Sequence, residues 1–171
     1  RMVTEYLKGK IGRNIDIFYA YACLMGGIEL AFELRETTNY LLVSEELFPA
    51  DSWSYEALAS INNNANISPI DLGSAFCDSA YNYFSVEDRY FTLSLIDLSK
   101  TGDLYQSINE YSAAALELIN SSADIKQYFN AAAANSYSMV TGGFYYIDIN
   151  DYLDKIVEDP NSVFSTSLKN K

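Results

Sequence analysis

Short apolar runs alternate with amphipathic segments along most of the chain. Residues 15–22 (IDIFYAYA) and 40–44 (YLLVS) are rich in β-branched and aromatic side chains, a composition typical of strands covered on both faces. Residues 90–96 (YFTLSLI) and 144–149 (FYYIDI) have the same character. We interpret these four runs as the strands of one parallel sheet.

Helical periodicity fills the intervals between these runs. Apolar side chains recur at helical spacing over 28–34, 69–84, 104–119 and 123–140, with a shorter segment at 152–157. Ser68, Pro69 and Asp71 form a typical helix start, because Ser caps free amides and Pro suits the first helical position. Strands that alternate with helices predict an α/β fold with a mainly parallel sheet.

The length of 171 residues and the 49% of hydrophobic residues suit one domain with its own core. We expect a core over 15–157 and a polar tail over 158–171. Residues 1–14 stand apart, because they hold four of the 11 basic residues but only one of the 23 acidic ones. The start, RMVTEYLKGK, has no apolar signal-peptide stretch, so we expect a chain that begins within a longer protein or after processing.

The formal charge of −12 restricts the partners of this protein. An acidic surface repels the phosphates of nucleic acids and of anionic membranes and tolerates cationic ligands. No apolar run approaches the roughly 20 residues that a bilayer-spanning helix needs. We therefore expect neither nucleic acid nor membrane as a partner.

The chain contains no histidine, which excludes a self-sufficient Ser-His-Asp or Cys-His hydrolase and most zinc sites. Cys23 follows the predicted strand at 15–22 and precedes the predicted helix at 28–34, where α/β proteins often place reactive groups and where helix amides favour a thiolate. The alternative is a cysteine that only packs. Cys77, on the apolar side of the 69–84 helix, is expected to be inert core, and no disulfide framework is present.

The residues around Cys23 resemble the region of the catalytic cysteine in clostripain-like cysteine peptidases. The similar segments are YACLMGGIE at 21–29 and AFELRETTNYLLVSEELFPADSWSYEAL at 31–58. The family pattern is a strand that ends in Asp-x-Cys-Leu-Met-Gly, a helix with an ELR-type segment, and a strand that ends in Ser-Glu-Glu with Pro and Trp close behind. YFTLSLIDLSK at 90–100 and FYYIDINDY at 144–152 resemble later strands of the family, so the likeness covers most of 15–157.

The resemblance implies a caspase-like α/β/α sandwich, shared with gingipains and legumains, and a cysteine endopeptidase with a Cys-His dyad. In that family the histidine lies on an earlier strand, and processing often separates light and heavy chains. This chain would then be the heavy chain or its cysteine-bearing part, with a histidine-bearing light chain, or the amino-terminal part of the same precursor, as its partner. A shortened form of a longer protein would explain the missing histidine equally. The resemblance also implies a secreted or cell-envelope bacterial protein.

The family mechanism assigns roles to several residues. Cys23 would attack the scissile carbonyl of a peptide to give a thioester, and its backbone N–H would hold the oxyanion. The family usually cleaves after Arg or Lys by means of an acid two positions before the cysteine, where this chain has Tyr21. Asp51 is our candidate for a compensating acid and Trp53 for an aromatic wall, which would give weaker basic specificity. Asp51 could equally be an exposed turn residue.

No set of metal ligands is apparent, and no cofactor is expected. Clostripain itself uses calcium, so calcium is a weak possibility, and Glu45 with Glu46 could bind it, line the pocket or be structural. Two other functions stay open: a degenerate homologue that binds peptides without cleaving them, and an unrelated acidic interaction domain.

Overall fold

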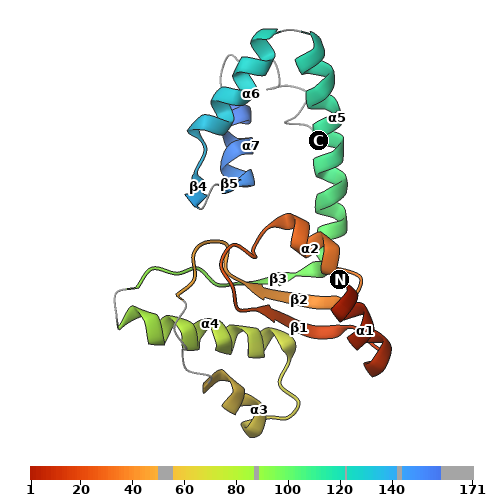
Figure 1. Cartoon of the computed structure of the whole chain (residues 1–171), viewed down its shortest axis with the longest axis vertical. Helices are drawn as coiled ribbons and strands as arrows, with labels where there is room; N and C mark the ends of the chain where they lie inside the picture. Colours follow the sequence, from red (N-terminus) through yellow and green to blue (C-terminus); the bar gives the residue numbers. More distant parts are fainter. Residues whose placement is uncertain (50–55, 87–88, 122, 142–143, 159–171) are drawn as a thin grey trace. The chain divides into compact units, whose positions relative to one another are not determined.

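The structure is a computed structural model that describes residues 1–49, 56–86, 89–121, 123–141 and 144–158 (Figure 1). The chain divides into two compact units, Arg1–Ile108 and Asn109–Lys171, and each is described by itself below. Helix α5 (Thr101–Ser121) begins in the first unit and ends in the second. The expectation of a single domain stays a prediction.

The first unit is built around a three-stranded sheet with the order β1-β2-β3. Its strands are β1 (Ile15–Ala20), β2 (Thr38–Val43) and β3 (Ser94–Asp97). Its helices are α1 (Met2–Ile11), α2 (Ile28–Leu34), α3 (Ala59–Asn63) and α4 (Pro69–Ser85), with short 3-10 helices η1 (Glu56–Leu58) and η2 (Leu98–Lys100). The α/β class predicted from the sequence is confirmed.

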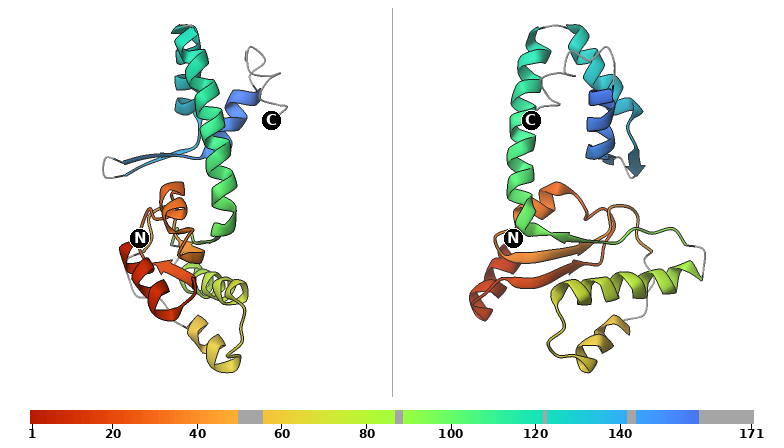
Figure 2. Two further views of the ribbon diagram at one scale, coloured as in Figure 1. Left: turned by 90° about the vertical axis from the view of Figure 1, so that its right-hand side faces the viewer. Right: turned by 180° about the vertical axis from the view of Figure 1, so that it is seen from behind.

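Two apolar clusters cover the two faces of the sheet, and α2 and α4 lie on opposite sides of it (Figures 1 and 2). The cluster on the α4 side contains the buried residues Leu42, Phe48, Ala57, Phe76, Ala80 and Phe84. The cluster on the α2 side contains Ala31, Leu34, Leu41, Val43 and Leu98. Successive side chains of β2 therefore point into different clusters, as in a strand that is covered on both faces.

The third strand differs from the prediction in extent and direction. β1 and β2 are parallel, but β3 covers only the end of the predicted run and pairs antiparallel with β2, with Ser94 opposite Val43. The reason is the path of the chain. Pro69, at the start of α4, lines the same surface hollow as Ile15 at the amino end of β1, and α4 runs from there toward the carboxyl ends of the parallel strands (Figure 1). The segment after α4 therefore enters the sheet at the carboxyl ends of β1 and β2, so β3 runs antiparallel to them.

The basic amino-terminal segment folds as α1, a helix that the apolar pattern did not predict. α1 ends at Gly12, whose φ of 73° is the left-handed conformation that commonly terminates helices. Two contacts hold α1 to the turn before β2. Thr37 Oγ1 lies 2.9 Å from Thr4 Oγ1 in a buried hydrogen bond, and Lys8 Nζ donates to the carbonyl of Glu36 at 2.7 Å.

The second unit contains the end of α5 and a separate hairpin. Its further elements are α6 (Ala123–Asn135), β4 (Ser138–Thr141), β5 (Phe144–Ile147) and α7 (Ile149–Glu158). Ala115, Phe129, Ala132 and Ile156 form its buried core. The predicted helix over 123–140 is wrong beyond Asn135, because residues 138–141 form β4 and pair antiparallel with β5. The prediction that this segment is a fourth strand of one parallel sheet is therefore wrong, because β5 pairs only with β4 among the described residues.

The other predicted helices are confirmed, whereas α3 was not predicted. α2 covers the predicted 28–34, and α4 begins as predicted, with the Ser68 hydroxyl accepting the backbone N–H of Asp71 at 3.1 Å. No helix in the described ranges combines the length and apolar character that a bilayer crossing requires. Most of the predicted tail at 158–171 lies outside the described residues.

Candidate active site

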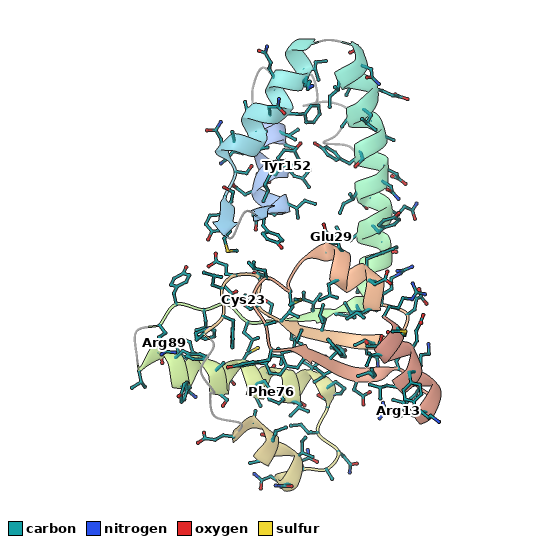
Figure 3. All side chains as sticks on the ribbon, in the orientation of Figure 1. Arg13, Cys23, Glu29, Phe76, Arg89 and Tyr152 are labelled. Carbon is teal, nitrogen blue, oxygen red and sulfur yellow. The ribbon has the colours of Figure 1, made fainter. Side chains whose placement is uncertain are left out.

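Cys23 lies just past the carboxyl end of β1, and Figure 3 shows it at the opposite end of that strand from Arg13. We call residues 21–27 the cysteine loop. Residues 44–48, which follow β2, are called the acidic turn because they begin Ser-Glu-Glu. Since β1 and β2 are parallel, both segments leave the sheet at the same edge, where α/β proteins commonly bind ligands.

Three backbone hydrogen bonds join the cysteine loop to the acidic turn. Leu24 N–H donates to the carbonyl of Glu46 at 3.1 Å. Met25 N–H and Gly26 N–H both donate to the carbonyl of Ser44, each at 2.9 Å. The position of the loop is therefore fixed by the segment that follows the neighbouring strand.

The cysteine loop is also tightly packed and locally strained. A Cβ atom on Gly26 would lie 2.5 Å from Cγ and 2.9 Å from Cα of Glu45, so only glycine allows this approach. Leu24 has a φ of 61°, a left-handed conformation that is uncommon for a leucine. Such strain persists only where neighbouring contacts fix the backbone, and it is frequent at functional sites.

The sulfur of Cys23 contacts the backbone of Phe48 through two hydrogen bonds. Phe48 N–H donates to Cys23 Sγ at 3.2 Å, and the thiol lies 3.4 Å from the Phe48 carbonyl oxygen, to which it can donate. A thiolate would keep the first bond and lose the second. The amide that reaches the sulfur is thus that of Phe48. It is not one of the free amides at the start of α2, which the sequence had led us to expect.

Phe48 is held in place by its own side chain. The ring is buried and packs edge-on against Tyr21, Phe84 and Phe91, with ring centroids 5.1, 5.6 and 6.1 Å away. The apolar core thereby fixes a backbone amide at the sulfur. Phe48 could not be identified from the sequence, because a single aromatic residue before Pro49 indicates only a core position.

The backbone N–H of Cys23, the predicted oxyanion donor, meets no hydrogen-bond acceptor among the residues that the structure describes. The amides of the next three residues all have carbonyl partners in the acidic turn. Within the described ranges, no acceptor therefore competes with a ligand oxygen for the N–H of Cys23.

Tyr21 lies at the same edge of the sheet as Cys23. Its side chain is 37% exposed, and its hydroxyl donates to the carbonyl of Pro49 at 3.4 Å. Asp51 and Trp53, the other predicted pocket residues, lie outside the described residues. Their roles therefore stay predictions.

Cys77 has a different environment from Cys23. It lies on α4, half-buried, with its thiol 3.8 Å from the carbonyl oxygen of Leu93. Burial raises the pKa of the Cys77 thiol, and the charge of Asp78 acts in the same direction. Both cysteines are free. These features support the prediction that Cys77 is poorly reactive.

Other features do not belong to this site. A surface hollow of about 350 Å³ lies at the amino end of β1, lined by Ile11, Arg13 and Ile15 among others, at the far end of the strand from Cys23. Among the described residues, no three acidic, cysteine or histidine side chains are grouped as they would be around a metal ion. That finding does not address calcium.

Comparisons with known proteins give a family and a fold. The sequence matches the clostripain family over residues 3–169. A clostripain from Bacteroides thetaiotaomicron ATCC 29148, solved with the peptide inhibitor BTN-VLTK-AOMK, is 18% identical with a TM-score of 0.54, and the match covers 95% of this chain and 68% of that one. A B. fragilis cysteine protease is 18% identical with a TM-score of 0.46, with 60% and 44% covered. No curated protein matches. The chain thus spans less than half of one solved relative and about two thirds of the other.

Proposed function

Because the chain belongs to the clostripain family, we propose that it is the cysteine-bearing part of a cysteine endopeptidase, with Cys23 as the nucleophile. Family membership supports a peptidase function in general. The observation that carries the more specific proposal is the position of Cys23, which follows the carboxyl end of β1 and whose sulfur accepts the backbone N–H of Phe48.

The proposed reaction follows thiol chemistry. Cys23 Sγ attacks the scissile carbonyl, and the amine leaves with a proton supplied by a histidine, so that a thioester remains. Water then hydrolyses the thioester and returns the thiol. The backbone N–H of Cys23, which has no acceptor within the described part of the chain, would bind the oxyanion, and the Phe48 amide would stabilise the thiolate before attack.

The histidine must come from another segment, because these 171 residues contain none. We propose a light chain, or the amino-terminal part of the same precursor, as the partner. β1 supports this proposal, since among the described residues it pairs only with β2 although its run IDIFYA is mostly apolar. All six of its residues are only half-buried. Apolar strands of this kind are usually interior strands with neighbours on both sides.

We further propose a preference for Arg or Lys before the cut, weaker than in a pocket with two acids. The formal charge of −12 favours cationic substrates, and the inhibitor bound to the Bacteroides clostripain carries lysine next to its AOMK group. Tyr21 supplies a half-exposed ring and a hydroxyl but no charge. We keep Asp51 as the proposed pocket acid and Trp53 as its neighbour because, in the sequence, they follow Pro49 closely, and the carbonyl of Pro49 accepts the Tyr21 hydroxyl.

One alternative has a specific observation in its favour. Tyr21 stands where the family usually has its pocket acid, so a homologue that binds peptides without cleaving them is the second candidate. The family match removes the third, an unrelated acidic interaction domain.

Activity of the complete precursor tests the proposal. Wild type should hydrolyse a fluorogenic peptide library and co-purify with a polypeptide that contains histidine, whereas Cys23→Ala should be inactive and Cys77→Ala active. Peptide binding without hydrolysis by the wild type would instead establish the degenerate homologue. Full hydrolysis by Cys23→Ala would refute the assignment of the nucleophile.

A further inference from the structure

The hydroxyl of Thr92 is the centre of a hydrogen-bond network in the acidic turn. Thr92 Oγ1 accepts the backbone N–H of Glu45 at 3.1 Å and that of Glu46 at 3.0 Å. It also lies 2.9 Å from Ser44 Oγ. Thr92 reaches the turn because it precedes β3, which enters the sheet beside the end of β2.

The numbers of hydrogens and lone pairs on the Thr92 hydroxyl determine which groups donate and which accept in this network. A threonine hydroxyl has one hydrogen to donate and two lone pairs to accept with. Both lone pairs of Thr92 receive backbone N–H groups, so its hydrogen is directed to Ser44 Oγ. Ser44 then donates its own hydrogen to the carbonyl of Glu46 at 3.0 Å, which also accepts the N–H of Leu24 at 3.1 Å.

We propose that Thr92 is a positioning residue for Cys23, acting through Ser44 and the acidic turn. This inference rests on the proposed role of Cys23 as the nucleophile. Carbonyls of the turn accept the backbone N–H groups of Leu24, Met25 and Gly26, and the last residue of the turn, Phe48, supplies the amide at the sulfur. A single hydroxyl thereby determines the conformation of the segment that holds the reactive atom.

The hydroxyl, not the shape of the side chain, carries this role. Valine in place of Thr92 would fill nearly the same space but could neither accept the backbone N–H groups of Glu45 and Glu46 nor donate to Ser44 Oγ. The bonds to Glu46 and Ser44 are part-buried, so their loss is costly, whereas the bond to Glu45 is exposed. The turn would rearrange to recover these bonds. Leu24, already strained, would then be free to leave its left-handed conformation.

The test compares three variants of the complete protein on the best-cleaved fluorogenic peptide. Thr92→Val should lower kcat roughly ten- to a hundredfold with KM changed less than about threefold, because a misplacement near 1 Å has that effect on catalysis. Thr92→Ser, which keeps the hydroxyl, should retain kcat within about threefold. Thr37→Val is the control, since the Thr37 hydroxyl is also hydrogen-bonded, and is more deeply buried, but Thr37 directly precedes the amino end of β2. It should leave kcat within about twofold.

The outcomes separate this inference from the proposed function. Loss of activity in Cys23→Ala together with wild-type kcat in Thr92→Val would overturn the role of Thr92 alone. Equal losses in Thr92→Ser and Thr92→Val would also overturn it, because the hydroxyl would not be the cause. If circular dichroism shows that Thr92→Val does not fold, Ser44→Ala replaces it as the test. This variant interrupts the same network and should lower kcat about three- to tenfold. Unchanged kcat in Ser44→Ala would then refute the proposal.

Discussion

The backbone N–H of Phe48 donates a hydrogen bond to the sulfur of Cys23, and the two residues belong to segments that follow neighbouring parallel strands. The proposed nucleophile, which follows β1, therefore receives its hydrogen bond from the segment that follows β2. The buried ring of Phe48 fixes this amide, so the packing of the core and the chemistry of the site share one residue.

Alkylation should distinguish the two cysteines. At neutral pH iodoacetamide should label Cys23 first and abolish activity, because burial raises the pKa of the Cys77 thiol and keeps it protonated. Labelling of Cys77 should increase as the pH rises above the ordinary thiol pKa of about 8.5. Peptide mapping by mass spectrometry measures both rates. Preferential labelling of Cys77 at neutral pH would contradict the assignment.

Phe48→Ala should affect both stability and activity. Removing a buried phenylalanine ring typically lowers the free energy of unfolding by about 3–5 kcal/mol, which denaturant unfolding measures. It should also release the amide at the sulfur and lower kcat in the fraction that stays folded. Phe76→Ala is the control, because Phe76 belongs to the same buried cluster but lies on α4. If both variants retain equal kcat when folded, the Phe48 ring does not position the amide.

Gly26→Ala should disrupt the site through steric overlap alone. The added methyl would meet the backbone of Glu45 at 2.9 Å, so the cysteine loop and the acidic turn must separate. We expect at least a tenfold fall in kcat/KM, following the effect of small misplacements on catalysis. Gly9→Ala is the control, because its methyl would meet no atom within 4 Å. It should retain activity and gain up to about 1 kcal/mol of stability as a helical glycine replaced by alanine. Equal activity in Gly26→Ala and Gly9→Ala would argue against a close contact between Gly26 and Glu45.

Substitutions in the proposed pocket should change the preference for basic residues. Tyr21→Asp adds a carboxylate at the edge that carries Cys23, so cleavage after Arg or Lys should rise. Asp51→Asn should lower it, by roughly ten- to a hundredfold if one charge-assisted contact of about 1.5–3 kcal/mol is lost. A fluorogenic library varied at the residue before the cut measures both effects. A wild type that strictly prefers apolar residues, together with an unaffected Asp51→Asn, would remove basic specificity from the proposal and leave the peptidase assignment intact.

Local sequence patterns predicted the parts of the fold that depend on local chemistry. The buried strands β1 and β2 and the capped start of α4 follow from side-chain composition and spacing. The direction of β3 could not be predicted in this way, because it depends on the path of the chain through α4. β4 was missed because the alanine run at 131–134 extended the apparent helix.

In the candidate site, too, some features could be predicted from the local sequence and others depend on the folded chain. Cys23 was a candidate from its place after a strand together with the family resemblance, and Tyr21 from the family pattern. The contribution of Phe48 was not, because it comes from a backbone amide, a group that nearly every residue possesses. Thr92 lies far from Cys23 in the sequence, so only the folded chain reveals that its hydroxyl meets the acidic turn.

The hydrogen bonds between the cysteine loop and the acidic turn have a consequence for protein engineering. The conformation of residues 21–27 is not encoded by those residues alone, since their partners lie at 44–48 and at Thr92. Grafting the cysteine loop onto another α/β scaffold would therefore transfer the thiol without its geometry. A successful graft, or a library of variants of this protein, must keep all three segments together.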